Sequence, residues 1–179
     1  VTIVTHCEDN ETIKNNSDKV NSQNLTLDAS FHPIIRDDLC CYKSSSKVID
    51  LAKKYSSDLH VLHLTTEKEI KLFENIDLKN KKITCEVCVH HLWFDESDYE
   101  KLGNFIVCNP AIKKVSDRNA LRKALKDGFI DYVATDHAPH SYDDKKLPYG
   151  KAPAGIPLIE HSFHMICLLY TSPSPRDRH

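Results

Sequence analysis

Three residues from distant parts of the chain carry side chains that together could bind a divalent cation. His6 and Asp136 each follow a short run of β-branched or apolar residues, and His63 lies near the end of another such run. Two imidazoles and a carboxylate suit zinc, which lowers the pKa of a bound water toward neutrality. Asp136 could also take a proton from that water as a general base and then deliver it to a leaving nitrogen. These residues therefore predict a hydrolytic metal site, although their long spacings form no local ligand motif.

Each of these residues also has a structural interpretation. A histidine at a strand end can be a core side chain bonded to the backbone, and Asp136 can cap the turn that contains Pro139. His90 and His91 are weaker candidates, because adjacent residues of a strand face opposite sides and at most one would reach a site. In a small α/β domain unrelated to barrels, the three candidate ligands would lie far apart.

The cysteines and the basic residues give weaker signals. Cys85 and Cys88 match C-x-x-C, but a structural zinc site would need a second pair, and residues i and i+3 of a strand face opposite ways. We expect the adjacent Cys40 and Cys41 to be buried or partly exposed thiols without a role. A basic cluster is expected to form a solvated helix face: Lys113, Lys114, Arg118 and Arg122.

Four β-like runs would position the candidate ligands. They are β-branched or continuously apolar, as in strands buried on both faces of a parallel sheet: Thr2–Thr5, Leu59–Leu64, Ile83–Val89 and Ile130–Thr135. Caps and apolar periodicity predict helices over Ser44–Tyr55, Thr66–Asn75 and Ser116–Asp127. Asn10–Phe31 is polar and aperiodic, so we expect a loop or a short irregular helix there. The alternation predicts an α/β fold with polar residues at the strand carboxyl ends, as in (β/α)8 barrels and in doubly wound sheets.

Composition narrows the class of protein. The 179 residues carry 24 lysines and arginines against 26 aspartates and glutamates, a near balance that would draw in neither nucleic acid nor an anionic membrane. No apolar run is long enough to span a bilayer. The seven cysteines are irregularly spaced, which predicts reduced thiols in a cytoplasmic protein rather than disulfides.

Both ends of the chain look unlike natural termini. The chain opens on Val1 rather than on Met, directly in an apolar run, which indicates an internal start. Pro173 and Pro175 interrupt the helix that Ile159–Leu169 begins, and the composition changes abruptly there. We therefore expect residues 1–165 to form the folded part and residues 166–179 to be a non-native or disordered tail.

The segments around these residues resemble the dihydroorotases of the long, bacterial class within the amidohydrolase superfamily. The resemblance covers roughly residues 1–165 and rests on six segments in the family's order: Thr5–Asp9, Leu59–Thr66, Glu86–Leu92, Asn109–Lys113, Asp131–His140 and Lys151–Gly155. The block Ala-Thr-Asp-His-Ala-Pro-His, which ends at His140, is the most specific of them. The resemblance implies an α/β fold in which this chain supplies the C-terminal half, strands five to eight, of a metal-dependent-hydrolase (β/α)8 TIM barrel.

The resemblance also implies roles for individual residues. His6 and His63 match the metal ligands after strands five and six, whereas His60 does not. Asp136 matches the residue after strand eight that both binds metal and moves protons. The matching substrate-binding positions are Asn109, Ala154 and Gly155, which contact the pyrimidine ring, and His140, which helps hold the substrate carboxylate.

The implied activity is the reversible cyclisation of N-carbamoyl-L-aspartate to (S)-dihydroorotate in pyrimidine biosynthesis, with one or two zinc ions in each complete site. The family's first ligands, a His-x-His pair with a nearby arginine, are absent, and so is the bridging residue after strand four. We therefore expect this polypeptide alone to be inactive and, because a half-barrel leaves two sheet edges open, poorly stable.

Other functions fit the same pattern. Hydantoinases, dihydropyrimidinases and allantoinases share the barrel and the metals, but their substrates lack the carboxylate that His140 would hold. A non-catalytic relative that scaffolds aspartate transcarbamoylase is a further alternative, which the retention of His6, His63 and Asp136 disfavours. The small-molecule substrate is the main expected partner, and the resemblance leaves open a homodimer and an association with aspartate transcarbamoylase.

Overall fold

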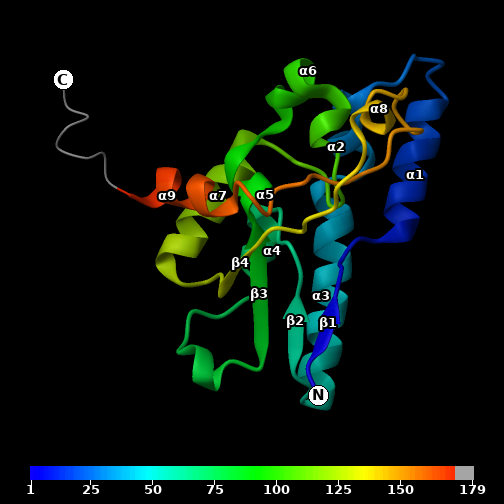
Figure 1. Cartoon of the computed structure of the whole chain (residues 1–179). Helices are drawn as coiled ribbons and strands as arrows, with labels where there is room; N and C mark the ends of the chain where they lie inside the picture. The colour runs from blue at the N-terminus through cyan, green and yellow to red at the C-terminus, as the bar shows by residue number, and fades with distance from the viewer. Residues whose placement is uncertain (172–179) are drawn as a thin grey trace.

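The computed structural model describes residues 1–171, and its centre is a four-stranded parallel sheet (Figure 1). The strands lie side by side in chain order: β1 (Ile3–Thr5), β2 (Leu59–Val61), β3 (Ile83–Cys88) and β4 (Tyr132–Ala134). Val4 lies opposite His60, and His60 lies opposite Thr84. Because every pair is parallel, all four carboxyl ends lie at the same edge of the sheet.

Helices occupy the connections between the strands and the segment after the last one. Between β1 and β2 lie α1 (Asn10–Asn21), α2 (His32–Ile35) and α3 (Asp38–Tyr55). Between β2 and β3 lies α4 (Glu67–Ile70), and between β3 and β4 lie α5 (Val89–Trp93), α6 (Tyr99–Leu102) and α7 (Val115–Asp127). After β4 come α8 (Tyr142–Lys145) and α9 (Ser162–Tyr170). The predicted α/β alternation is confirmed, and none of the helices within residues 1–171 has the length and apolarity to cross a membrane.

The main core lies between one face of the sheet and the helices. Leu59, Val61 and Val87 of the strands are each 2% exposed or less and belong to one buried apolar cluster with Ile49 of α3 and Leu121 of α7. A second cluster packs segments that follow the strands and includes Val89 of α5, Tyr99 of α6 and Met165 of α9. This packing fixes the carboxyl edge of the sheet between two cores.

The opposite face of the sheet is open. Val4 on β1 is 57% exposed and Tyr132 on β4 is 46% exposed. Together with His60 and Thr84 they line a hollow of about 540 Å³. A closed (β/α)8 barrel covers this face with its other four strands. The arrangement therefore matches half of such a barrel, with the lumen side uncovered.

Helix α1 corrects one sequence-based expectation. Its residues fall within Asn10–Phe31, which the lack of periodicity assigned to a loop or a short irregular helix, yet α1 is regular over 12 residues. The side chain of Asp9 caps it by accepting from the Thr12 amide at 2.9 Å. Only Thr12 and Val20 of this helix are buried, so its sequence carries almost no apolar stripe.

Other boundaries also differ from the predictions. Helix α3 begins at Asp38 rather than Ser44, because Asp37 caps it by accepting from the Cys40 amide at 2.9 Å. Helix α4 ends at Ile70 rather than at the predicted Asn75. Helices α3 and α7 end where they were predicted to end, at Tyr55 and Asp127. Helix α9 runs past residue 165, and the rest of the predicted tail, residues 172–179, lies outside the described residues.

Candidate functional site

The imidazoles of His6 and His63 meet at the carboxyl edge of the sheet. His6 follows β1 directly and His63 lies two residues beyond β2, and their Nδ1 and Nε2 atoms are 3.0 Å apart. His63 is 5% exposed, whereas the side chain of His6 is 43% exposed. Zinc–nitrogen bonds of about 2.0–2.1 Å place two ligands of one tetrahedral ion roughly 3.3 Å apart. The two ring nitrogens are therefore spaced as ligands of a shared cation would be.

The backbone at two of the predicted ligands is unusual. His63 has a φ of 36° and Asp136 a φ of 43°, in the left-handed region that non-glycine residues rarely adopt. Asp136 lies two residues beyond β4, just as His63 lies two residues beyond β2. Such strain costs about 1–3 kcal/mol and persists mainly where function requires it. The shared conformation indicates that both side chains are aimed by the turn that ends their strand.

Asp136 lies at the same edge of the sheet and is exposed. Partial burial raises the pKa of its carboxyl group, and the neighbouring His6 opposes that shift. A carboxyl group with a raised pKa is better suited to carry a proton between two sites. Within residues 1–171 no hydrogen bond joins Asp136 to His6 or His63, so the three predicted ligands share an edge but only the histidines are in contact.

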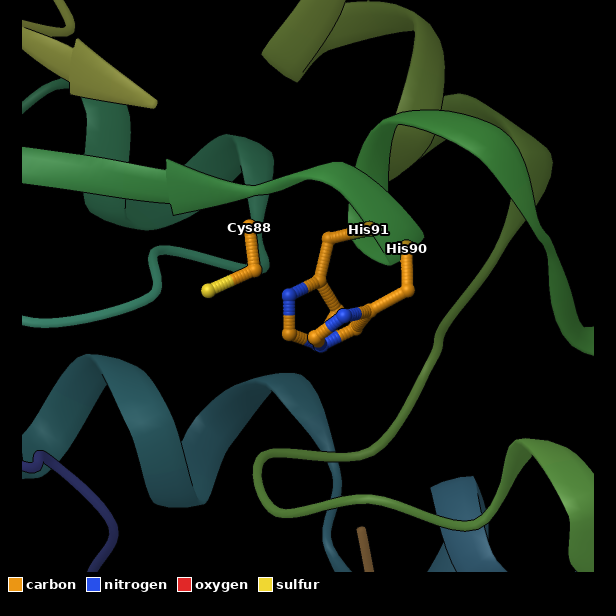
Figure 2. A group of neighbouring side chains, drawn as sticks. All are labelled: Cys88, His90 and His91. Carbon is orange, nitrogen blue, oxygen red and sulfur yellow. The ribbon is translucent and has the colours of Figure 1, made fainter. Parts of the chain in front are cut away.

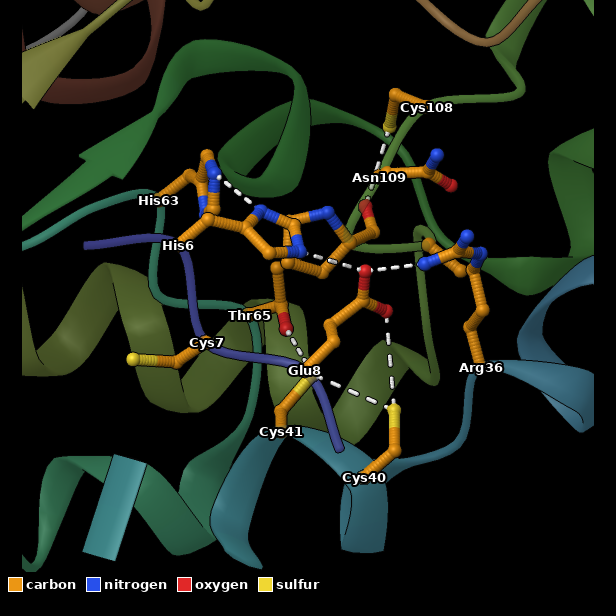
Figure 3. Close-up of polar contacts among 12 residues, drawn as sticks. His6, Cys7, Glu8, Arg36, Cys40, Cys41, His63, Thr65, Cys108 and Asn109 are labelled. Atoms are coloured by element: carbon orange, nitrogen blue, oxygen red, sulfur yellow. Dashed lines mark hydrogen bonds and ion pairs between the residues drawn. The ribbon is translucent and has the colours of Figure 1, made fainter. Parts of the chain in front are cut away.

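Glu8 orients the exposed histidine. Its side chain is 2% exposed, and its Oε2 atom lies 2.9 Å from His6 Nε2 and also accepts from Arg36 Nη1 (Figure 3). Burial alone would raise the pKa of Glu8, but its contacts with His6 and Arg36 outweigh burial and lower it. The ionised carboxylate accepts a hydrogen bond from the Nε2–H group of His6. The lone pair of the neutral ring is therefore on Nδ1, which faces His63.

His60 is excluded as a ligand by its contacts. Its Nδ1 lies 2.8 Å from Thr84 Oγ1 and its Nε2 lies 3.2 Å from Glu86 Oε2, so both ring nitrogens are engaged on the lumen face. The Nδ1 atom of His63, in contrast, has no partner among the described residues. The two histidines of this segment therefore differ in their contacts: both ring nitrogens of His60 are engaged on the lumen face, and Nε2 of His63 lies beside His6.

The predicted basic face is wrong for three of its four residues, and only Lys114 of the four is exposed. Lys113 is 6% exposed, and its ammonium group is held by the Ala111 carbonyl at 3.1 Å. Arg118 donates to Asp95 at 2.6 Å, and Arg122 donates to the Leu92 carbonyl at 2.7 Å. The two arginines tie α7 to the segment after β3, and Lys113 ties the loop before α7 to Thr65 after β2, so these three side chains hold the loop in place rather than face solvent.

The expectation for His90 and His91 is also wrong. It assumed a strand, but β3 ends at Cys88 and both histidines lie in α5, where they are 1% and 3% exposed. A helix turns successive side chains by about 100°, so two adjacent residues can both be buried. The expectation for Cys40 and Cys41 as buried thiols agrees with their exposure of 0%.

Comparison with known proteins shows which proteins the chain is related to. No protein-family model matches it. A dihydroorotase from Macrococcus caseolyticus is 34% identical over 169 residues, which are 94% of this chain and 38% of that protein. Dihydroorotases from Staphylococcus aureus and Bacillus licheniformis match the same shares at 34% and 33% identity. This chain is a homologue of the dihydroorotases.

Solved structures give the same fold for this dihydroorotase homologue. A D-hydantoinase (dihydropyrimidinase) from Thermus sp. aligns over 99% of this chain and 39% of its own, with a TM-score of 0.82 and 24% identity. A dihydroorotase from Saccharomyces cerevisiae in complex with 5-fluoroorotic acid covers 73% of this chain and 37% of its own, with a TM-score of 0.67 and 22% identity. The described residues thus have the architecture of part of an amidohydrolase barrel, and the chain spans 38% of the length of the curated relatives it matches.

Three of the four predicted substrate-binding residues of the dihydroorotase homologue lie on two loops held together at the same edge. His140 Nε2 lies 3.0 Å from the Ala154 carbonyl, and the Gly155 amide donates to the Val107 carbonyl at 2.8 Å. A Cβ atom at Gly155 would lie 2.7 Å from the Ala138 side chain. The loop after β4 and the loop before α9 are therefore in close backbone contact, and a side chain at position 155 would separate them.

Asn109 is held by a histidine that the sequence analysis did not assign to the site. Nε2 of His32 lies 3.1 Å from Asn109 Oδ1 and 2.9 Å from the Cys108 carbonyl, while Nδ1 lies 2.9 Å from the Tyr149 hydroxyl. Both neighbours of Nε2 are acceptors, so Nε2 carries the proton and Nδ1 accepts from Tyr149. His32 thereby fixes the amide of Asn109 with its NH2 group free to face a ligand. No local motif marks His32; only the contact reveals it.

Proposed function

We propose that this chain forms the second half of the catalytic barrel of a zinc-dependent dihydroorotase, which interconverts N-carbamoyl-L-aspartate and (S)-dihydroorotate. The contact of His6 with His63 carries the proposal, because it brings two predicted ligands to a ligand-like spacing without any local motif. The identity to proteins named dihydroorotase supports the choice of substrate.

The donor set fits zinc. His6 offers a lone pair on Nδ1, because Glu8 accepts a hydrogen bond from its Nε2–H group, and His63 offers its Nε2 atom 3.0 Å away. Asp136 offers a carboxylate from the same edge of the sheet. Two imidazoles and a carboxylate are a common zinc-binding set. When bound, zinc acts as a Lewis acid that lowers the pKa of water and polarises the carbonyl under attack.

Asp136 performs the proton transfers in the proposed mechanism. In the hydrolytic direction, its carboxylate takes a proton from the attacking water. The same group then delivers that proton to the ring nitrogen as the amide bond breaks. In the direction of cyclisation, the two transfers run in reverse.

Asn109 and His140 orient the substrate in this proposal. The amide of Asn109, fixed by His32, offers its NH2 group to the ring, and the imidazole of His140 pairs with the substrate carboxylate. The backbone of Ala154 and Gly155 forms the neighbouring wall. Fixing the ring at both ends places its carbonyl for attack, which lowers the entropic part of the barrier.

The proposal is tested with a chimera, because the described residues form four strands and the barrel has eight. The chimera joins the part of the Macrococcus caseolyticus dihydroorotase that this chain does not match to residues 1–171 of this chain. We expect the zinc-loaded chimera to turn over dihydroorotate, and the 179-residue chain alone to show no turnover. A chimera that folds and binds zinc but leaves dihydroorotate unchanged contradicts the proposal.

Hydantoin hydrolysis is the competing function, since a hydantoinase structure aligns over almost the whole chain. The discriminating residue is His140, because hydantoin and allantoin lack the ring carboxylate that it would bind. We expect the chimera to prefer dihydroorotate over both. The His140→Ala chimera should lose that preference, mainly through a higher KM for dihydroorotate. A chimera that prefers hydantoin would assign the chain to the competing activity.

A further inference from the structure

A second group of metal-binding side chains lies where β3 gives way to α5. Cys88 is the last residue of β3, and His90 and His91 are in the first turn of α5 (Figure 2). One ligand atom from each lies within 4.8 Å of the other two, and the residues are 0%, 1% and 3% exposed. None of them belongs to the set formed by the predicted ligands after β1, β2 and β4.

Three of the four ring nitrogens of these two histidines lack partners among the described residues. Within residues 1–171, both nitrogens of His90 and the Nδ1 atom of His91 are buried without a hydrogen bond. An unpaired buried polar group costs about 1–3 kcal/mol, and native proteins retain few of them. A bound cation would accept a lone pair from each ring and remove much of this cost.

The protonation of His91 is fixed by its neighbour. Its Nε2 atom lies 3.0 Å from the Pro110 carbonyl, which can only accept, so Nε2 carries the proton. The neutral ring then has its lone pair on the unpartnered Nδ1. Histidines that bind metals commonly donate their other nitrogen to a backbone carbonyl, which orients the ring. His91 already has that arrangement.

The other cysteine-containing group in the described residues is less suited to a metal. It consists of Glu8, Cys40 and Cys41. The carboxylate of Glu8 is already paired with His6 and Arg36, and the Cys40 thiol lies 3.0 Å from the Asp37 carbonyl. Those contacts would have to break before a cation could bind, whereas the two histidines after Cys88 have free nitrogens.

We propose that Cys88, His90 and His91 form a site for a zinc-class divalent cation. One thiolate and two imidazoles favour zinc over magnesium or calcium. Zinc bonds of about 2.0–2.3 Å place ligands roughly 3.3–3.8 Å apart, so binding draws these side chains together by up to about 1.5 Å. The cation replaces the proton of the Cys88 thiol, which passes to solvent, and both rings bind in the neutral form. The site ties the end of β3 to α5.

Cobalt titration of the reduced 179-residue chain tests this site, because a thiolate bound to Co²⁺ gives a charge-transfer absorption band. The first site, formed by His6, His63 and Asp136, contains no sulfur. If that site does not bind Co²⁺, the charge-transfer band is unchanged. We expect one equivalent of thiolate-bound Co²⁺ in the wild-type chain and no band in Cys88→Ser. The Cys40→Ser and Cys41→Ser variants should keep the band, and His90→Asn should weaken Co²⁺ binding at least tenfold.

Two further measurements test the site even if a substituted chain does not fold. X-ray absorption of the zinc-loaded chain should show one sulfur and at least one imidazole bound to zinc, also in the Cys40→Ser, Cys41→Ser double variant. His161→Asn, an exposed histidine, is the matched control for His90→Asn and should bind as the wild type does. The proposal is overturned by a wild-type chain without a thiolate band, by a band that survives Cys88→Ser, or by the loss of bound sulfur in the double variant.

Discussion

His6 Nδ1 and His63 Nε2 lie 3.0 Å apart although 57 residues separate them in the chain. The parallel pairing of β1 with β2 produces this contact, because it sets Thr5 beside Val61 and so brings the residues that follow each strand to the same edge. Any function assigned to this edge depends on the register of these two strands.

The first prediction separates His63 from His60. We expect His63→Asn to weaken zinc binding to the first site at least tenfold, because it removes one of two imidazoles at ligand spacing. His60→Asn should leave zinc affinity within about twofold, because both His60 nitrogens are engaged on the lumen face. Competition with a chromophoric chelator measures both, in the Cys88→Ser background so that the site after β3 does not contribute. Equal losses in the two variants would contradict the assignment.

The second prediction concerns Glu8. The Glu8→Gln variant should bind zinc about 10–100-fold more weakly, because the carboxylate no longer orients the ring of His6. Glu11→Gln, an exposed change at the start of α1, is the control and should have no effect. Isothermal titration with zinc measures the difference, and an unchanged affinity in Glu8→Gln would remove Glu8 from the site.

The third prediction concerns proton transfer. In the chimera, Asp136→Asn should lower kcat about 10²–10⁴-fold, the usual contribution of a general acid–base group. Binding of dihydroorotate should remain measurable, because Asn109 and His140 hold the substrate. Asp143→Asn in the exposed first turn of α8 is the control and should retain full turnover. Near-normal kcat in Asp136→Asn would exclude the proposed role.

The elements that carry the predicted ligands could be anticipated because their signals are local. The runs that became β1 to β4 are apolar and carry histidine or aspartate near or directly after their ends, so the carboxyl edge of a parallel sheet was the expected meeting place. The cap at Asp9, by contrast, starts a helix with few buried residues, and its sequence resembles that of a loop. In α1, the capping hydrogen bond and the contacts with α2 and α3 outweigh the weak helical signal of the local sequence.

The residues that support the site could not be found from spacing alone. Arg36 reaches Glu8, and His32 reaches Asn109, only because the segment before α3 folds over the carboxyl edge. His90 was misjudged for a related reason: the chain turns from strand to helix at Cys88, and the apolar run gives no sign of that turn. Contacts between distant segments depend on packing, which a periodic pattern does not encode.

The fourth prediction concerns the contact between the two substrate loops. Gly155 has a φ of 142°, and an added Cβ would lie 2.7 Å from both the side chain and the carbonyl oxygen of Ala138. Gly155→Ala should therefore lower the thermal midpoint of the chain and, in the chimera, raise the KM for dihydroorotate. Gly150→Ala is the control: it shares a positive φ of 83° but has no atom within 4 Å of an added Cβ. If the two variants behave alike, the loss comes from backbone strain and not from separation of the loops.

The fifth prediction follows from the buried neutral state of His32. Burial lowers its pKa to about 4, below the value of about 6.5 expected in the unfolded chain. Between these values the unfolded chain binds the extra proton, so the contribution of His32 to stability is complete above pH 6.5 and is lost as the pH falls toward 4. We expect the free energy of unfolding to fall by up to about 2 kcal/mol more in the wild type than in His32→Gln between pH 6.5 and 5.

Urea unfolding at the two pH values measures this difference, and His161→Gln should follow the wild type because His161 is exposed. Burial also holds His63 and His90 neutral, but both residues remain in the two proteins, so their effects cancel in the comparison. Parallel pH profiles for the wild type and His32→Gln would show that His32 is not held neutral in the fold.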